Sequence, residues 1–269
     1  CVQKGSGLKF GRQNLWRHKQ LNQRFYFSLS VCFPKVVFYS SSNSTDNYIM
    51  TELVRQLPIL YSFRRCPYAI RARMTLHHCS IPVELREVLL ADKPRAMLLV
   101  SPKGTVPILV LNDGSVLDQS LAIMHWAIRS TYPDASDANN WLAAEIPILG
   151  RRLIEANDTE FKRNLDAYKY QKANDSRPPS DYRTDAERFL VRLEDRLQSN
   201  RFLMADTISL VDIAIFPFIR QFAGVDPNWF EQTPYAKLRG WLACLLQSDL
   251  FLASMTKHPV WQQDESSQN

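Results

Sequence analysis

The sequence predicts a small α/β domain followed by an all-helical domain. Apolar runs alternate with helical patterns over residues 56–132, and only helical patterns occur over residues 139–262. The net positive charge lies ahead of both domains, in residues 1–49. With 269 residues, of which 45% are hydrophobic and 22% are charged, the chain is long enough to build two packed cores.

The first domain is predicted to have the element order β-α-β-α-β-β-α. Alternating apolar and polar residues over Val83–Leu89 predict a half-buried strand. Pro67 predicts a helix start, because proline lacks the N–H that the first helical turn leaves unpaired. The run Asn112-Asp-Gly predicts a tight hairpin between two strands. The elements are expected at residues 58–63, 67–78, 83–89, 92–99, 106–111, 115–117 and 118–129.

The second domain is predicted from four helical patterns. Pro147 lies inside the first pattern and should kink or split that helix. The polar stretch 157–181 ends in Arg177-Pro-Pro-Ser and is interpreted as a loop with one helical turn. The helices are expected at residues 139–156, 182–198, 209–223 and 234–247.

The extension, residues 1–49, holds seven Lys or Arg residues and one acid, Asp46, and this excess equals the +6 net charge of the whole chain. The remainder is balanced, so the basic pI gives no reason to expect nucleic-acid binding. We expect the extension to be disordered. It is either a targeting peptide of the mitochondrial or plastid kind, or translated sequence ahead of a start at Met50, which would leave a cytoplasmic protein.

Several functional classes are not indicated by the sequence. No run of about 18 apolar residues is present, so no membrane-spanning helix and no membrane partner are expected. The histidines lack metal-ligand spacing and no glycine-rich phosphate loop occurs, so we expect neither a metal nor a nucleotide. Widely spaced cysteines favour a reducing compartment over a disulfide framework. They lie at positions 1, 32, 66, 79 and 244.

Cys66 lies where a predicted strand turns into a predicted helix. The free N–H groups of a helix N-terminus favour an anion. Four arginines lie nearby in the sequence: Arg64, Arg65, Arg71 and Arg73. Both effects predict a thiol pKa lowered from about 8.5 toward neutrality, and therefore a nucleophilic thiolate. A buried, inert cysteine at a helix start is the alternative.

The motif Cys66-Pro-Tyr-Ala69 contains no second cysteine. Cys79 lies thirteen residues further along the same predicted helix. That separation is roughly 20 Å at 1.5 Å per residue, whereas a disulfide requires Cα atoms within about 7 Å. An external thiol must therefore resolve any disulfide on Cys66, which indicates a monothiol mechanism.

Three segments, in order, resemble the thioredoxin-fold domain of the glutathione transferase superfamily. They are Tyr61-Ser-Phe-Arg-Arg-Cys-Pro-Tyr, Ser101-Pro-Lys-Gly-Thr-Val-Pro-Ile-Leu and Asp118-Gln-Ser. The Cys-Pro-aromatic motif is similar to that of omega-class and other cysteine-type members, and the likeness covers about residues 56–262. The resemblance implies a thioredoxin-like N-terminal domain, an all-α C-terminal domain and glutathione as cosubstrate.

The resemblance also implies a glutathione site. Val106, followed by a cis Pro107, would pair its backbone with the cysteinyl part of glutathione. Ser120 and the helix N-terminus would hold the γ-glutamyl carboxylate. Gln119 stands where many relatives have Glu and would face the glutamyl amine.

Two further residues complete the implied site. Lys93 would approach the glycyl carboxylate, and Tyr68 would line the site beside the sulfur. Each implied residue also has a plainer alternative: an ordinary trans proline, a helix cap at Asp118 or Ser120, a solvated lysine or a packed tyrosine.

The helical half carries a second matching motif, Ser209-x-x-Asp212. It predicts a capping box with Asp where Glu is usual, and we assign both residues a structural role. The stretch 161–171 is rich in basic and aromatic residues. It is either a solvated helix or a lid that brings Tyr168 or Lys169 to a second-substrate pocket.

Three functions follow from these residues. The first is a glutathione-dependent thiol transferase or reductase, in which Cys66 forms a mixed disulfide, as in deglutathionylation or dehydroascorbate reduction. The second is a conjugating transferase in which Ser62 activates the glutathione thiol. The third is a non-enzymatic interaction module. The expected partners are glutathione, a small electrophilic or disulfide substrate, and a second copy of the chain in a homodimer.

Overall fold

The computed structural model describes residues 57–132, 147–170 and 175–262. The predicted extension 1–49 and the start of the predicted helix 139–156 lie outside the described residues. The N-terminal part has the predicted order of elements. They are β1 (Ile59–Ser62), α1 (Pro67–His78), β2 (Glu84–Glu87), α2 (Arg95–Val100), β3 (Ile108–Val110), β4 (Val116–Leu117) and α3 (Ser120–Thr131).

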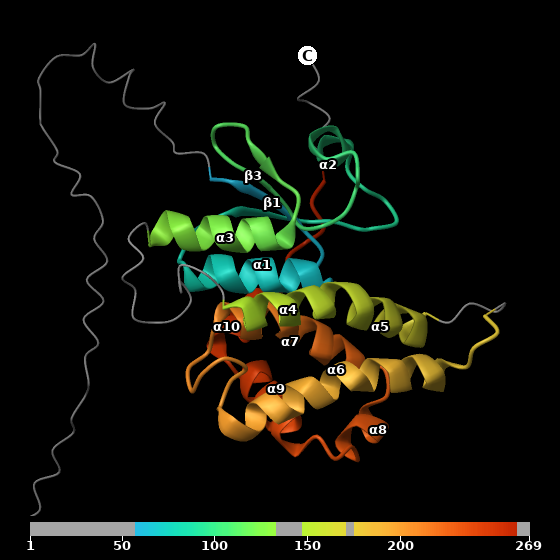
Figure 1. The fold of residues 1–269 in the computed structure, drawn as a ribbon. Helices are drawn as coiled ribbons and strands as arrows, with labels where there is room; N and C mark the ends of the chain where they lie inside the picture. Colours follow the sequence, from blue (N-terminus) through green and yellow to red (C-terminus); the bar gives the residue numbers. More distant parts are fainter. Residues whose placement is uncertain (1–56, 133–146, 171–174, 263–269) are drawn as a thin grey trace, which may run out of the picture. The chain divides into compact units, whose positions relative to one another are not determined.

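The four strands form one mixed sheet in the order β2-β1-β3-β4. Strand β1 is parallel to β2 and antiparallel to β3, so that Leu60 lies opposite Leu85 and Leu109. The hairpin between β3 and β4 turns at Gly114, whose φ of +81° suits glycine because it lacks a Cβ. Helices α1 and α3 lie between the sheet and the helical part, with α2 on the other side of the sheet (Figure 1).

The second part is helical throughout its described elements. They are α4 (Ile148–Ala156), the π-helical turn η1 (Asn157–Phe161), α5 (Lys162–Lys169), α6 (Pro179–Ser199), α7 (Leu210–Ala223), α8 (Pro227–Glu231), α9 (Ala236–Leu246) and α10 (Asp249–Ser254). Pro147 is the N-cap residue of α4. The predicted kink or split at this proline involves residues 139–146, which lie outside the described residues. The short helices α8 and α10 were not predicted. None of the helices in the described ranges is long and apolar enough to cross a bilayer.

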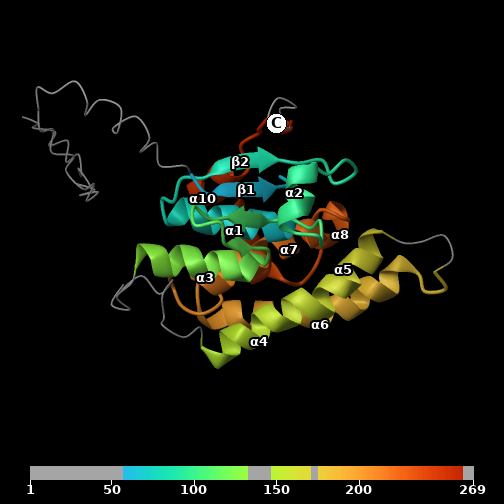
Figure 2. The ribbon, with the colours of Figure 1, turned by 90° about the horizontal axis from the view of Figure 1, so that it is seen from above.

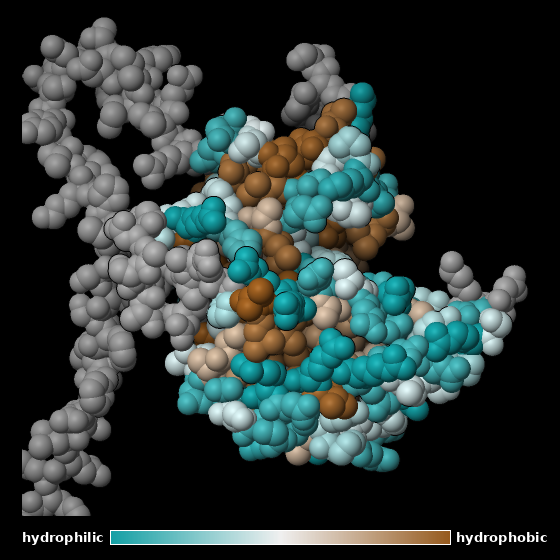
Figure 3. All heavy atoms as spheres, in the orientation of Figure 1, coloured by the Kyte–Doolittle hydropathy of each residue, from teal (hydrophilic) through white to brown (hydrophobic). Residues whose placement is uncertain are grey.

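The predicted loop over residues 157–181 is wrong for its first half. The π-helical turn and α5 continue directly from α4. Phe161, Leu165 and Tyr168 recur at helical spacing and are buried on one face. The outward surface of α5 and α6 is mostly hydrophilic (Figure 3), so the sequence of this stretch looks like a polar loop although its inner face is packed.

One apolar core joins the sheet to the helices. Leu60 of β1 and Ile70 of α1 belong to the same buried cluster as Ile213 and Phe216 of α7. Helix α1 packs against α3, α7 and α10. In the view from above in Figure 2, α1 lies beneath the strands of the sheet. Helix α1 is therefore packed against elements of both parts of the fold.

The predicted capping box of α7 is confirmed. Asp212 accepts hydrogen bonds from the Ser209 backbone N–H at 2.9 Å and from the Ser209 hydroxyl at 2.5 Å. It also accepts from the Leu203 backbone N–H at 2.9 Å and from the Trp241 indole at 2.8 Å. A fully buried carboxylate with four donors ties three segments together, which agrees with the structural role assigned to it.

The end of the described chain covers the outer edge of the sheet. Val260 forms a parallel bridge with Glu87 of β2, and the Trp261 backbone N–H donates to the Glu87 carbonyl at 2.8 Å. The guanidinium of Arg86 lies 4.3 Å from the centre of the Trp261 ring. This bridge, which the sequence did not reveal, fixes β2 and the Glu87 side chain beside the loop before α1.

Candidate functional site

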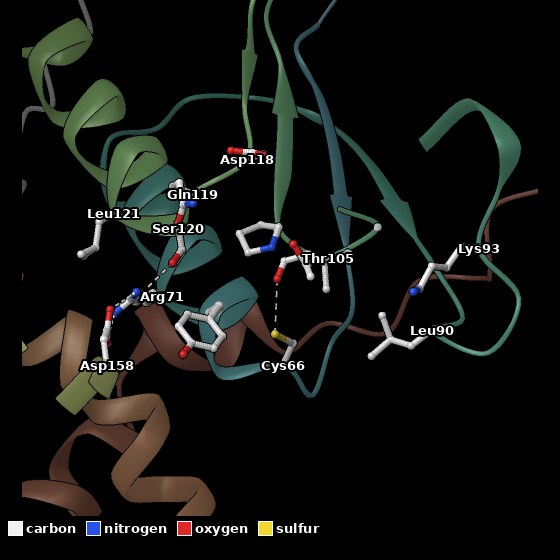
Figure 4. Close-up of a pocket in the computed structure, with 14 residues that line it drawn as sticks. Cys66, Arg71, Leu90, Lys93, Thr105, Asp118, Gln119, Ser120, Leu121 and Asp158 are labelled. Atoms are coloured by element: carbon white, nitrogen blue, oxygen red, sulfur yellow. Dashed lines mark hydrogen bonds and ion pairs between the residues drawn. The ribbon is translucent and has the colours of Figure 1, made fainter. Parts of the chain in front are cut away.

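A cavity of about 600 Å³ opens beside the N-terminus of α1. The sequence motifs that line it are far apart in the chain, and the fold brings them together (Figure 4). All seven residues predicted for catalysis or glutathione binding are on its wall: Cys66, Tyr68, Lys93, Val106, Pro107, Gln119 and Ser120. The wall also holds residues that the prediction did not assign to glutathione: Arg71, Leu90, Gly104, Thr105, Asp118, Leu121 and Asp158.

Cys66 is half-buried and occupies the N-cap position of α1. Its backbone N–H donates to the Phe63 carbonyl at 3.0 Å, which closes the turn between β1 and the helix. Its thiol donates to the Val106 carbonyl, with the sulfur 3.6 Å from that oxygen. The thiol is thus held against the loop that precedes β3.

The predicted lowering of the Cys66 pKa is wrong. Burial raises the pKa of the thiol, and this effect exceeds the opposing ones. The backbone N–H groups of Ala69 and Tyr68, followed by the positive charges of Lys162 and Arg73, lower it. The sequence placed basic residues near Cys66 but could not show that the thiol is desolvated or where each guanidinium points.

The bond between Val106 and Pro107 is cis, as the resemblance implied. This loop presents the Val106 backbone to the cavity opposite Cys66. A peptide ligand could add here as a short strand, because a backbone edge offers both a donor and an acceptor. Val106 and Pro107 are buried, and the Val106 carbonyl faces the Cys66 thiol.

One end of the cavity is the N-terminus of α3. Gln119 is the N-cap residue and Ser120 begins the helix. The Ser120 hydroxyl accepts a hydrogen bond from Nε of Arg71 at 3.0 Å. Its own proton therefore remains available for an acceptor on a ligand.

Arg71 ties this end of the cavity to the helical part. Its guanidinium donates to both oxygens of Asp158, at 2.9 and 2.7 Å, and to the Ala214 carbonyl at 3.3 Å. Its side chain is 2% exposed and that of Asp158 is 20% exposed. The pair is bidentate and nearly buried, and it places a carboxylate from η1 on the cavity wall.

The other end of the cavity holds Lys93 and Leu90, on the far side of Cys66 from Ser120 (Figure 4). Gly104 has a φ of +58°, and a Cβ there would lie 3.3 Å from two atoms of the Lys93 side chain. Glycine at this position thus lets the lysine stem lie against the loop. The Lys93 side chain is exposed and can reach the carboxylate of a ligand bound at this end of the cavity.

Asp118 lies near the α3 end of the wall. Its carboxylate pairs with Lys103 at 2.8 Å and accepts from the Ser101 hydroxyl at 3.4 Å. The hydrogen bond from Lys103 holds the pKa of Asp118 below its usual range. Asp118 therefore has a partner from its own domain and is not a helix cap, because Gln119 occupies that position.

Ser62 does not lie on the cavity wall. It is fully buried, and its hydroxyl accepts from Nη1 of Arg73 at 2.9 Å. Tyr168, the residue of the alternative lid, is buried and packs its ring 5.5 Å from that of Phe222. The arrangement thus favours Cys66 over Ser62 as the reactive group, and it places Tyr168 in the core.

No group of three or more His, Cys, Asp or Glu side chains that could hold a metal ion occurs within residues 57–132, 147–170 and 175–262.

Comparisons with known proteins agree with this fold. Residues 60–136 match the family of the glutathione S-transferase N-terminal domain, and residues 151–244 match that of the C-terminal domain. The chain belongs to the glutathione S-transferase family. The predicted family, fold and enzyme class are therefore confirmed.

The individual relatives are distant. Probable glutathione S-transferase DHAR2, chloroplastic, from Oryza sativa subsp. japonica is 24% identical over 194 residues, 71% of this chain and 65% of that protein. Glutathione S-transferase omega-1 from Mus musculus is 24% identical over 202 residues, 75% of this chain and 77% of that protein. A solved glutathione transferase family member from Pseudomonas fluorescens pf-5, with two glutathione bound, has a TM-score of 0.63 at 19% identity, covering 78% of this chain and 96% of that one.

Proposed function

We propose that this protein is a glutathione-dependent thiol transferase or reductase with Cys66 as its single reactive thiol. The observation that carries the proposal is that Cys66 shares one cavity with the Val106–Pro107 loop and the N-terminus of α3. The relatives also support it. Glutathione S-transferase omega-1 is among them, and the Cys-Pro-aromatic motif at Cys66 resembles that of omega-class and other cysteine-type members. A probable DHAR2 protein is another relative. Ser62 is buried away from the cavity, which weighs against the conjugating alternative.

The proposed reaction has two thiol–disulfide exchanges. The Cys66 thiolate attacks the glutathione sulfur of a glutathionylated substrate, and the substrate thiolate leaves and takes up a proton. A second glutathione, as thiolate, then attacks the glutathione sulfur of the Cys66 mixed disulfide. This step releases the Cys66 thiolate and glutathione disulfide, so the mixed disulfide of the substrate is reduced while one free glutathione thiol is oxidised.

Glutathione would lie along the cavity in an extended form. Its γ-glutamyl carboxylate would accept from the Ser120 hydroxyl and the first N–H groups of α3. Its ammonium would face the side-chain oxygens of Gln119 and Asp158, both on the wall. Its cysteinyl backbone would pair with Val106, and its glycyl carboxylate would approach Lys93.

Ligand binding would also change the state of the Cys66 thiol. The Cys66 thiol donates to the Val106 carbonyl, which favours the protonated form. A glutathione backbone N–H on that carbonyl would compete with the thiol for the same acceptor. Loss of the thiol hydrogen bond favours ionisation, so glutathione binding and Cys66 activation would be coupled.

We further infer that the protein works in the cytoplasm as a homodimer and that its second substrate is a small disulfide or electrophile. The balanced charge of the chain beyond residue 49 fits a small-molecule enzyme. An organelle would follow instead if residues 1–49 act as a targeting peptide.

The test compares Cys66→Ser with Ser62→Ala in two assays. One is the glutathione-dependent reduction of hydroxyethyl disulfide, and the other is the conjugation of glutathione to chlorodinitrobenzene. We expect Cys66→Ser to reduce the disulfide at the background rate while Ser62→Ala stays active. Disulfide reduction that survives in Cys66→Ser and fails in a folded Ser62→Ala would reverse the assignment.

A further inference from the structure

Arg73 lies two helical turns beyond Cys66 on α1 and is buried, although no ligand contact is assigned to it. Side chains on a helix lean toward its N-terminus, so Arg73 reaches back to the loop that precedes Cys66. We infer that Arg73 is a positioning residue for Cys66, because it fixes residues 62–66 and holds a partly uncompensated positive charge behind the thiol. The inference rests on the proposed role of Cys66.

Arg73 and Glu87 together fix the loop at one residue. Nη2 of Arg73 donates to the Arg64 carbonyl at 2.8 Å, and the Arg64 N–H donates to Oε1 of Glu87 at 2.6 Å. Nη1 of Arg73 donates to the Ser62 hydroxyl at 2.9 Å. The loop is therefore held from α1 and from β2 at once, two residues before Cys66.

The charge of Arg73 is not closely matched. Its shortest distance to the Glu87 carboxylate is 3.7 Å, and its Nε is buried without a hydrogen-bond partner. Burial lowers the pKa of Arg73 to about 10, while Glu87 raises it, so the guanidinium stays charged at neutral pH. Because the low-dielectric interior screens this charge weakly, an anion nearby is stabilised.

Cys66 is the group nearby that can become such an anion. Lys162 of α5 and Arg73 of α1 are the charged side chains that lower the pKa of its thiol, against the larger effect of burial. Glu87 of β2 faces Arg73, and Tyr68 of α1 lies beside the thiol with its own pKa raised to about 12, chiefly by burial. Of the two cations, Arg73 is the one that also fixes the Cys66 loop.

The geometry gives two substitutions that act in opposite directions. Arg73→Met removes the positive charge and the loop contacts, so it disfavours the thiolate. Glu87→Gln keeps an oxygen for the Arg64 N–H but removes the negative charge opposite Arg73, so it favours the thiolate. A purely structural role predicts no such opposition, because both changes would then only lower stability.

The experiment follows alkylation of Cys66 by iodoacetamide from pH 5 to pH 10, by mass spectrometry of the peptide that contains Cys66 in the full chain. This readout needs no glutathione, so it is independent of the proposed activity. We expect Arg73→Met to move the inflection upward by about one pH unit, so that the alkylation rate of Cys66 at pH 7 is about tenfold lower. We expect Glu87→Gln to move it downward and to raise that rate a few-fold.

Arg73→Lys is the conservative variant. It keeps the charge but cannot bridge Ser62 and Arg64 with a planar fork, so its inflection should lie between those of the wild type and Arg73→Met. Thermal melts identify any variant that fails to fold. If Arg73→Met fails to fold, the direction in which Glu87→Gln shifts the inflection decides whether the inference holds. Inflections that stay unchanged in the folded variants, or that move in the same direction, would overturn the inference.

Discussion

The two buried arginines of α1 act at different places: Arg71 at the Ser120 end of the cavity, and Arg73 at the loop before Cys66. Arg71 meets Asp158 with two hydrogen bonds of 2.9 and 2.7 Å, and it also donates to the Ser120 hydroxyl and to the Ala214 carbonyl. Arg73, two residues further on, is 3.7 Å from the Glu87 carboxylate and donates its hydrogen bonds to residues of the loop before Cys66.

This difference separates binding from reactivity. A closely paired arginine contributes little net charge, so its value is to orient Ser120 and to join two parts of the fold. A loosely paired arginine leaves positive charge in the interior, where it acts on the thiol. Substitutions at the Arg71 end should therefore change stability and affinity, and those at the Arg73 end should change the pH dependence of Cys66.

The largest effect is expected when the Arg71 pair is broken. Asp158→Ala leaves a buried guanidinium without its carboxylate and should lower the free energy of unfolding by about 3 kcal/mol, the lower end for such pairs because Asp158 is 20% exposed. Urea unfolding measures this change in the free energy of unfolding. Glu87→Gln removes the charge opposite Arg73 but keeps an acceptor for the Arg64 N–H, so it should cost only about 1 kcal/mol. Equal losses would contradict the contrast between the two pairs.

Ser120→Ala tests the binding end alone. Loss of a hydroxyl donor to the γ-glutamyl carboxylate should cost about 1.5–3 kcal/mol, or roughly 10–100-fold in KM for glutathione. The kcat at saturating glutathione should change little, because Cys66 and its loop are untouched. Steady-state kinetics separate the two parameters. Ser115→Ala, in the exposed hairpin, is the control and should leave both unchanged.

The pH dependence of Cys66 tests the reactive end. Because burial raises its pKa, the thiol of the free enzyme should be mostly protonated at pH 7, and its alkylation rate should rise about tenfold per pH unit until an inflection above about 8.5. The same shift makes the folded state prefer the thiol, so its contribution to stability is lost as the pH rises through that inflection. An inflection near neutrality in the free enzyme would show that the helix N-terminus outweighs burial.

The smallest effect is expected at the ion pair between Lys103 and Asp118. Lys103 pairs with Asp118, but the two side chains are 52% and 29% exposed. An exposed pair of this kind contributes less than about 1 kcal/mol. Lys103→Ala should therefore shift the urea midpoint only slightly and leave KM for glutathione within about threefold. A tenfold rise in KM would show that Lys103 contacts the ligand.

The parts of the site that the sequence could predict are local. Cys66, the Val106–Pro107 pair and Gln119–Ser120 each stand at the end of a predicted strand or the start of a predicted helix, where backbone groups are free. Their placement on one wall follows from the sheet order, since β1, β3 and α3 meet there. The strand–helix junction was sufficient to single out Cys66, whereas the other four residues were assigned from the resemblance to the glutathione transferase superfamily.

The contacts that the sequence could not predict join distant residues. Asp158 lies 87 residues from Arg71, and only the π-helical turn in a stretch interpreted as a loop brings it to the cavity. A buried arginine requires a partner, but which acid supplies it depends on the packing of α4 and α5. The direction of the Cys66 pKa shift depends on desolvation, which is set by the folded surroundings of the thiol and not by the residues adjacent to it in the sequence.

The most direct test of the central claim is the intact mass of the protein after brief exposure to oxidised glutathione, measured beside Cys66→Ser. We predict one glutathione adduct on the wild type that is absent from the variant and removed by reduced glutathione. The absence of an adduct, or equal adducts on both proteins, would contradict Cys66 as the single reactive thiol.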